Sequence, residues 1–354
     1  MSYLFSDILL NQRAVSVTDI VESKATARTA FEAETFSLIQ CWLQKKDEFT
    51  LTTSGSTGAP KEITLTRNQL QQSALRTISA LGLMKNDTAL VCLDTKYIAG
   101  KMMLVRALES NMKIIAVEPA ADPLQNIQTP VHFAALVPLQ LQEIIKNPDS
   151  TKKLNQIKAV IVGGASVSNS LQKQLSNLTC AIYATYGMTE TVSHIGLQRL
   201  SGLQATDLFT VMPGITIETD KRNCLTIRLP ESSEKIITND LVEVAGPGKF
   251  RWIGRYDNII NSGGFKISPE KVEKVIEKFL PNQSFFVSAF PDERLGEKLV
   301  LIIEGETTGM DFLPLIKNLH PYEIPKEVIC MKAFIRTETG KINRQKTRSL
   351  AIGQ

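Results

Sequence analysis

Short apolar runs alternate with helical patterns through the first half of this chain, and this alternation constrains the fold more than any other feature. The runs at 89–93, 114–117, 133–137 and 159–162 are typical of buried strands, and residues 98–110, 138–147 and 167–177 favour helices between them. Strands that alternate with helices predict a parallel sheet, and therefore a protein of the α/β class.

Helical spacing also marks two segments before the first of these strands. Apolar residues recur at helical intervals within residues 22–45, which predicts one helix there. Thr66 is a suitable N-cap for a second helix, and Gly82 is placed to end it in a left-handed conformation.

The pattern changes after about residue 195, where apolar and polar residues alternate between turn signals. This alternation predicts antiparallel strands. A boundary is expected near Gly254, which divides the chain into a large domain, 1–254, and a small α+β domain, 255–354. The predicted elements of the small domain are a charged helix at 269–279, strands at 285–290 and 299–304, and a helix at 311–319.

Composition excludes several classes of protein. The 354 residues are 43% hydrophobic and 21% charged with a net charge of +4, as expected of an ordinary globular chain rather than a nucleic-acid-binding module. The five cysteines form no Cys-x-x-Cys pair, and their odd number favours a reducing cytoplasm. We expect neither a signal peptide nor a membrane span, because no basic segment precedes an apolar N-terminal run and no apolar run is long enough.

Residues 52–61, Thr-Thr-Ser-Gly-Ser-Thr-Gly-Ala-Pro-Lys, form the most distinctive polar segment. Hydroxyls, glycines with accessible backbone N–H groups and a terminal lysine suit a bound polyphosphate. The spacing does not match a Walker A loop, and a flexible Ser/Gly linker is the alternative. We expect this segment to lie in a strand–loop–helix turn, between a strand at 49–51 and the helix that Thr66 begins.

Four weaker clusters follow, each with an ordinary structural alternative. Residues 186–191, Tyr-Gly-Met-Thr-Glu-Thr, could bind Mg²⁺ and a nucleobase or be an aromatic turn with a solvated glutamate. Gly163-Gly164 follows a strand and could border a ligand or be a simple turn. The segment 254–266 could bind a ligand or form an interdomain turn, and the lysine within 336–344 could be catalytic or merely solvated.

Taken together and in this order, the clusters resemble those of the adenylate-forming superfamily, which includes acyl-CoA synthetases, luciferases and peptide-synthetase adenylation domains. The resemblance extends from about residue 49 to 348, and residues 189–197 are most similar to the o-succinylbenzoate–CoA ligases of menaquinone biosynthesis. Two departures stand out. Relatives carry well over a hundred residues before the phosphate loop, so the region before it is expected to be shortened here, and Glu62 replaces the usual small residue after the lysine.

The resemblance implies a role for each matching position. The residues expected to bind phosphate are Thr53, Ser54, Gly55, Ser56, Thr57, Gly58 and Lys61. Those expected to bind the rest of the nucleotide are Gly163, Gly164, Ala165, Tyr186, Gly187, Met188, Asp240 and Arg255. Those expected to line the pantetheine channel are Gly263, Gly264 and Lys266. Thr189 is expected at the α-phosphate, Glu190 at Mg²⁺, Lys341 between the carboxylate and the α-phosphate, and Asp257 at a hinge. Tyr97, Lys101, Ser193 and His194 are the candidates for binding the acid, including a second carboxylate.

The activity implied is an AMP-forming acid–thiol ligase that uses ATP, Mg²⁺ and coenzyme A, with a homo-oligomer left open. Two alternatives remain from the sequence. One is a ligase for another aryl or short acyl acid, or an enzyme that loads a carrier protein. The other is a degenerate nucleotide-binding or interaction protein, which the joint presence of Glu190, Asp240, Arg255 and Lys341 disfavours.

Overall fold

A computed structural model describes residues 7–53, 61–280, 283–306, 317–336 and 342–352. The chain divides into two compact units. The first comprises residues 1–167, 171–216 and 228–235, and the second comprises 168–170, 217–227 and 236–354. The predicted boundary at residue 254 falls inside the second unit, and the separate small domain that begins there stays a prediction.

A mostly parallel sheet forms the centre of the first unit. Its parallel strands are β5 (Thr88–Val91), β6 (Lys113–Ala116), β7 (Phe133–Leu136), β8 (Ala159–Val162) and β9 (Ala181–Gly187), in the spatial order β9-β8-β7-β5-β6. These are the buried runs that the sequence singles out, so the predicted α/β class is confirmed. The strands are nearly all apolar because both faces of the sheet are covered.

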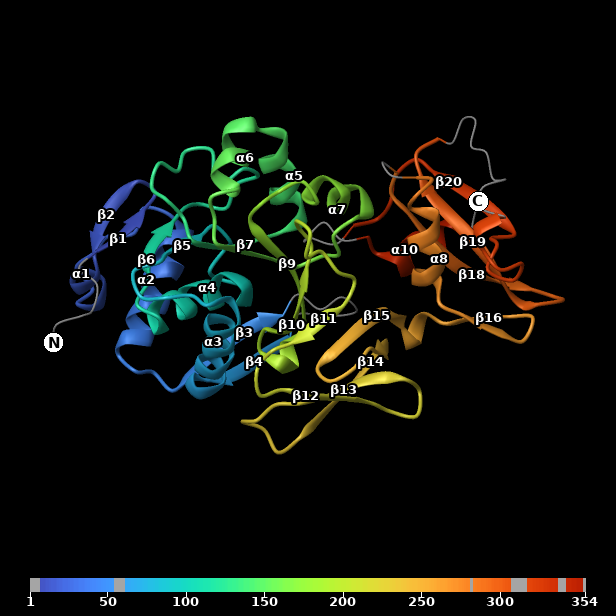
Figure 1. Ribbon diagram of the computed structural model, residues 1–354, viewed down its shortest axis with the longest axis horizontal. Coiled ribbons are helices and arrows are strands. Elements are labelled where there is room, and N and C mark those ends of the chain that lie inside the picture. Colours follow the sequence, from blue (N-terminus) through green and yellow to red (C-terminus); the bar gives the residue numbers. More distant parts are fainter. Residues whose placement is uncertain (1–6, 54–60, 281–282, 307–316, 337–341, 353–354) are drawn as a thin grey trace. The chain divides into compact units, whose positions relative to one another are not determined.

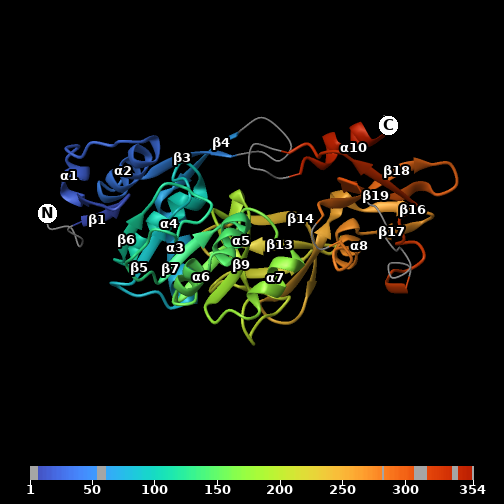
Figure 2. The same cartoon turned by 90° about the horizontal axis from the view of Figure 1, so that it is seen from above.

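Further strands extend both edges of this sheet. At one edge β1 (Asp7–Leu10) runs parallel to β6 and pairs with the antiparallel strand β2 (Arg13–Ser16), as Figures 1 and 2 show. At the other edge β10 (His194–Arg199) runs antiparallel to β9, and β11 (Phe209–Val211) runs antiparallel to β10.

Helices cover the two faces of the sheet in separate layers. Figure 1 shows α3 (Arg67–Leu81) and α4 (Ile98–Glu109) on one side of β5–β9, and α5 (Pro138–Lys146), α6 (Pro148–Leu154) and α7 (Asn169–Leu175) on the other. The second layer packs on a buried cluster that includes Leu90, Val160 and Ile182. Two further helices, α1 (Val17–Val21) and α2 (Ala30–Leu43), precede α3.

Local signals predicted the limits of α3 correctly. Thr66 caps the helix through a capping box with Gln69, and Gly82 ends it with a left-handed φ of 59°. The helix predicted over residues 22–45 is confirmed as α2, but its predicted start is wrong, because Thr29 caps α2 and residues 22–29 separate it from α1. Helix α6 was not predicted from the sequence.

The expected strand–loop–helix turn around residues 52–61 is also wrong. Strand β3 (Glu48–Thr53) pairs antiparallel with β4 (Lys61–Thr66), so the segment joins the two strands of a hairpin. The reason is the alternation of polar and apolar residues over 61–66, which suits a half-buried strand. The segment 54–60 itself lies outside the described residues.

The second unit contains β12 (Thr216–Thr219), β13 (Cys224–Arg228), β14 (Lys235–Val244) and β15 (Lys249–Arg255) as neighbours in that order, of which β14 and β15 run antiparallel. Its other elements are β16 (Ile260–Ser262), β17 (Phe265–Ile267), α8 (Pro269–Ile276), β18 (Phe285–Asp292), β19 (Gly296–Glu304), β20 (Glu327–Met331) and α10 (Arg344–Ile352). Most of the helix predicted at 311–319 lies outside the described residues. Within the part of the chain that the structure covers, every helix is too short or too polar to cross a membrane.

Candidate functional site

A cavity of about 310 Å³ opens beyond the carboxyl ends of the parallel strands in the first unit. Its wall comes from the ends of β7, β8 and β9, from one side of α4, and from the start of β10. Its lining residues are Leu93, Ile98, Ala99, Met102, Arg106, Ala135, Leu136, Val137, Ile161, Gly163, Gly164, Thr185, Gly187, Met188, Thr189, Val192, Ser193 and His194. Most are apolar, so the few polar groups stand out as candidates for fixing a ligand's orientation.

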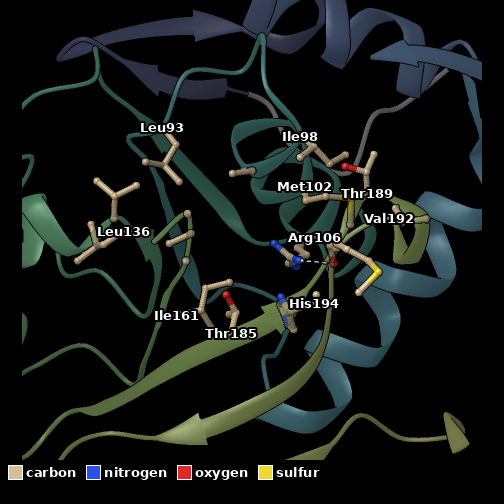
Figure 3. A pocket seen from close by; sticks show the side chains of 18 residues that line it. Leu93, Ile98, Met102, Arg106, Leu136, Ile161, Thr185, Thr189, Val192 and His194 are labelled. Atoms are coloured by element: carbon tan, nitrogen blue, oxygen red, sulfur yellow. Dashed lines mark hydrogen bonds between the residues drawn. The ribbon is translucent and has the colours of Figure 1, made fainter. Parts of the chain in front are cut away.

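Arg106 brings a positive charge into this largely apolar wall. Its side chain projects from α4 and only 2% of the residue's surface is exposed. The Nε atom donates to Thr77 Oγ1 and the Nη2 atom donates to Ser193 Oγ, each at 3.1 Å. Figure 3 shows the guanidinium beside His194, with the hydrogen bond to Ser193 dashed. Throughout residues 7–53, 61–280, 283–306, 317–336 and 342–352, no carboxylate forms an ion pair with Arg106.

Burial lowers the pKa of Arg106 to about 9, and the guanidinium therefore still carries its charge at neutral pH. A buried charge without a partner is costly in a folded protein. Because Arg106 lines a cavity and lacks a carboxylate partner among the described residues, the geometry suits an anionic ligand that would supply the missing charge.

His194 lies beside Arg106 as a neutral ring. Its Nε2 atom is 3.1 Å from Thr77 Oγ1, and the side chain is buried. Burial, and then the nearby charge of Arg106, lowers the pKa of His194 well below 6.5. The cavity therefore presents one cation and one neutral hydrogen-bonding ring, rather than two positive charges.

Close backbone contact explains why a glycine stands at the end of β9. A Cβ atom added at Gly187 would lie 2.4 Å from the carbonyl oxygen of Ser193 and 2.5 Å from the Cα atom of His194. Only glycine lets β10 start this close to β9. The contact brings Ser193 and His194 to the cavity wall.

Several positions that the resemblance assigns to ligands meet at this cavity. The lining includes Gly163, Gly164, Gly187, Met188, Thr189, Ser193 and His194. Glu190 follows Thr189 in a short 3-10 turn and is exposed, and Ala165 is exposed after Gly164. Residues alternate in direction along β9, so Tyr186 faces away from Thr185 and Gly187, with its ring 5.7 Å from that of Phe209. Their individual roles stay predictions.

Tyr97 and Lys101, the other candidates for binding the acid, lie at the start of α4 but do not line the cavity. The ammonium of Lys101 lies 4.0 Å from the carboxylate of Glu34, and burial lowers the pKa of Lys101. Tyr97 occupies the N-cap position and is 45% exposed. The proposed contact between Lys101 and a second carboxylate gains no support from this arrangement.

The segment expected to bind phosphate and the lysine expected to be catalytic fall largely outside the described residues. These positions are Ser54, Gly55, Ser56, Thr57, Gly58 and Lys341. Thr53 and Lys61 are paired in the β3–β4 hairpin, as the last residue of β3 and the first residue of β4. This pairing places the two ends of the glycine-rich segment side by side.

Within the second unit, Asp240, Arg255 and Asp257 form one polar group. The strand register pairs Asp240 with Arg255, whose Nη1 atom lies 3.6 Å from Asp240 and whose Nη2 atom donates to Asp257 at 3.0 Å. Asn239 also donates to both carboxylate oxygens of Asp257, at 3.1 Å each. The ribose role of Asp240 and the hinge role of Asp257 stay predictions.

Gly263 and Gly264 form the turn of the β16–β17 hairpin, with φ values of 56° and 85°. Two consecutive positive φ values require glycine-like residues in a tight hairpin, so local geometry alone accounts for this pair. Lys266 follows on β17 and is exposed. Their proposed place at a pantetheine channel stays a prediction.

A magnesium ion shared with a nucleotide needs few protein ligands, since phosphate oxygens and water complete its coordination. No group of three or more metal-binding side chains occurs in the described ranges. Glu190 is an exposed carboxylate immediately after Thr189, which lines the cavity. This single carboxylate fits an ion that arrives with the nucleotide better than a permanently bound structural metal.

Sequence reasoning missed Arg106, Thr77 and Ser73. Arg106 interrupts an otherwise apolar run, Met102 to Leu108, and a lone charge in a buried helix was the available signal. Ser73 and Thr77 occupy the apolar stripe of α3, and polar residues in such a stripe were a second available signal in the sequence.

Comparison with known proteins agrees with this arrangement. A profile described as "AMP-binding enzyme" matches residues 9–217. A 2-succinylbenzoate–CoA ligase from Escherichia coli K12 is 26% identical over 309 residues, which cover 83% of this chain and 66% of the relative. The chain thus spans about two thirds of that ligase's length.

Solved structures give a matching result. The acyl-CoA synthetase (AMP-forming)/AMP-acid ligase II-like protein from Dyadobacter fermentans is 40% identical with a TM-score of 0.65, and the match covers 94% of this chain and 97% of that protein. The o-succinylbenzoate coenzyme A synthetase from Bacillus subtilis, in complex with ATP and magnesium, has a TM-score of 0.70 at 20% identity, with 84% and 69% covered, and so supports the fold alone. The family profile covers more than half of this chain, and the chain therefore belongs to the AMP-binding enzyme family.

Proposed function

We propose that this protein is an AMP-forming acid–CoA ligase that converts 2-succinylbenzoate to its CoA thioester, a step of menaquinone biosynthesis. The observation that carries the choice of acid is Arg106, a buried cation on the cavity wall that has no carboxylate partner among the described residues. A dicarboxylic acid can react through one carboxyl group while the other pairs with this guanidinium. The E. coli relative, a 2-succinylbenzoate–CoA ligase, supports the same acid.

The cavity suits an acid with an aromatic body. Leu93, Met102, Leu136 and Ile161 supply apolar walls, and Arg106 supplies the charged end. Neutral His194 and Ser193 beside Arg106 offer further hydrogen bonds to oxygen atoms of the acid without adding charge. This combination favours an aryl acid with a second carboxylate over a long fatty acid.

The first chemical step joins the reacting carboxylate to the α-phosphorus of ATP and expels pyrophosphate. Two anions approach each other in that step, so positive charge is needed at the phosphates. Lys341 and the lysine of the phosphate loop, Lys61, would supply it, with Thr189 at the α-phosphate. Mg²⁺, held by Glu190 and phosphate oxygens, would neutralise further phosphate charge when bound.

The second step transfers the acyl group from AMP to the thiol of coenzyme A. The resemblance assigns this step to a swivel near Asp257 that withdraws Lys341 and brings Gly263 and Gly264 to the pantetheine arm. One active site would then perform both half-reactions in turn. We place the reaction in the cytoplasm, where ATP and coenzyme A are available and where the five cysteines would stay free thiols.

Mass spectrometry tests the proposal directly. Purified full-length protein is incubated with ATP, Mg²⁺, coenzyme A and 2-succinylbenzoate, and the mixture is analysed for 2-succinylbenzoyl-CoA and AMP. We expect both products in equal amounts, and neither when the acid is omitted. Folded protein that forms the CoA thioester of other acids but not of this one would contradict the proposed substrate.

A further inference from the structure

Helix α3 places two hydroxyl groups in the stripe that it buries. Its buried residues are Leu70, Ser73, Ala74 and Thr77, which follow helical spacing. Ser73 is 3% exposed and Thr77 is fully buried, at positions where an apolar side chain would normally pack. The two lie four residues apart, so their side chains point from the same face of the helix.

Thr77 contacts two of the polar residues that line the cavity. Its Oγ1 atom accepts a hydrogen bond from Arg106 Nε and lies 3.1 Å from His194 Nε2. The same hydroxyl is 3.3 Å from the carbonyl oxygen of Ser73, one turn earlier. Thr77 therefore fixes Arg106 and His194 relative to each other, although Thr77 does not itself line the cavity.

Ser73 makes the second connection. Its Oγ atom is 2.6 Å from the Oγ atom of Ser193, and Ser193 in turn accepts from Arg106 Nη2. The guanidinium is thus held at two nitrogens, once by Thr77 directly and once by Ser73 through Ser193. Among the described residues, Arg106 Nη1 donates no hydrogen bond, which leaves it available to a ligand in the cavity.

We propose that Thr77 and Ser73 are positioning residues that determine the acid specificity of this enzyme, because they hold Arg106 in the orientation that receives the second carboxylate. The proposal rests on the proposed function of the cavity. An arginine side chain has many rotamers, and a forked contact to a carboxylate depends on the direction of its plane. Two hydroxyls from one rigid helix set that direction before the acid arrives.

A substitution at Thr77 should change selectivity between acids more than it changes chemistry. Thr77→Val keeps the shape of the side chain and removes the hydroxyl, whereas Thr77→Ser keeps the hydroxyl. The two substrates are 2-succinylbenzoate and 3-benzoylpropionate, which lacks the ring carboxylate. We expect Thr77→Val to lower kcat/KM for the dicarboxylate about tenfold, mainly through KM, with little change for the monocarboxylate or for the KM of ATP. Thr77→Ser should restore the wild-type ratio.

Ser150→Ala is the matched control. Ser150 is fully buried and donates to Asp122 at 2.6 Å, so this variant also loses a buried hydroxyl bonded to a charged residue, but away from the cavity. It should leave the ratio of the two kcat/KM values unchanged. If the Thr77→Val variant loses activity equally with both acids, or keeps its full activity with both, the positioning role is overturned while the proposed function stands. A wild-type protein that binds and uses neither acid overturns both.

Discussion

The proposed selectivity of the cavity depends on one buried side chain, Arg106. A guanidinium that is 2% exposed needs hydrogen bonds and a counter-charge, and the described residues supply only the hydrogen bonds. On this account, the counter-charge comes from a bound ligand. The neighbouring His194 stays uncharged because burial and Arg106 both oppose its protonation.

Replacement of Arg106 by glutamine should remove the charge while it preserves some hydrogen bonding to Thr77 and Ser193. We expect kcat/KM for 2-succinylbenzoate to fall by about 10²-fold or more, as for the loss of one partner from a buried charge pair. The apparent KM of ATP should hardly change. Steady-state kinetics with both substrates varied provide the measurement, and an equal loss of affinity for ATP and acid would argue against a dedicated carboxylate contact.

His194 makes a contribution to the free energy of unfolding that depends on pH. Its pKa is lowered on folding, so the unfolded chain binds a proton that the folded chain excludes once the pH falls below 6.5. The contribution is complete above the unfolded pKa and is lost as the pH decreases. We expect this contribution to fall by about 1 kcal/mol as the pH drops from about 7.5 to about 5.5.

Urea unfolding of the wild type and of His194→Gln at several pH values isolates this contribution, since the other titrating groups are common to both proteins. Glutamine cannot be protonated in this range but can still contact Thr77. The wild type should lose more stability than the variant on acidification. Parallel pH profiles for the two proteins would show that His194 titrates normally.

Elements with strong local signals were predictable from the sequence, and elements defined by distant partners were not. The capping box of Thr66 and the apolar runs of β5 to β8 depend on residues within a few positions, so they were recognised correctly. Strand β4 was missed, because its partner β3 lies across a segment that suggested a turn into a helix. The contact of Thr77 with Arg106 depends on how α3 packs against α4, which no local pattern specifies.

The junction of β9 and β10 depends on Gly187. Gly187→Ala would force a methyl group against the backbone of Ser193 and His194, so we expect the free energy of unfolding to fall by about 2 kcal/mol or more and the acid's KM to rise. Gly202→Ala is a useful control, because Gly202 has a φ of 67° but its nearest neighbouring atom would be 3.6 Å away. That variant should cost only about 1 kcal/mol, through backbone strain. Similar losses in both variants would remove the case for a special contact at Gly187.

The whole molecule consists of two compact units, and the proposed chemistry divides between them. The cavity that we propose for the acid belongs to the first unit, whereas Asp240, Arg255 and Asp257 belong to the second. The resemblance assigns Lys341 to the adenylation step, and residues 236–354 belong to the second unit, so we propose that this unit serves adenylation. The motifs in the sequence predicted that residues from both parts of the chain take part in the reaction. The order of the motifs does not specify the distances between them.

Lys341→Ala should separate the two half-reactions. Loss of one charge-stabilising group should slow adenylation about 10²–10³-fold. Thioester formation from preformed acyl-adenylate should be nearly unaffected, because the proposed swivel withdraws the lysine in that step. Pyrophosphate exchange reports the first step and rapid-quench analysis with synthetic adenylate reports the second. Equal slowing of both steps would contradict a lysine that acts only in adenylation.

A crystal structure with a non-hydrolysable sulfamoyl analogue of 2-succinylbenzoyl-adenylate would locate the unreacted carboxylate. We predict that its oxygens lie about 3 Å from the guanidinium of Arg106, in the cavity that Leu136 and Ile161 line, while Thr77 and Ser193 keep their hydrogen bonds to that side chain. A carboxylate bound to Lys101 or left in solvent, with Arg106 contacting only its present partners, would contradict this account of what the enzyme selects.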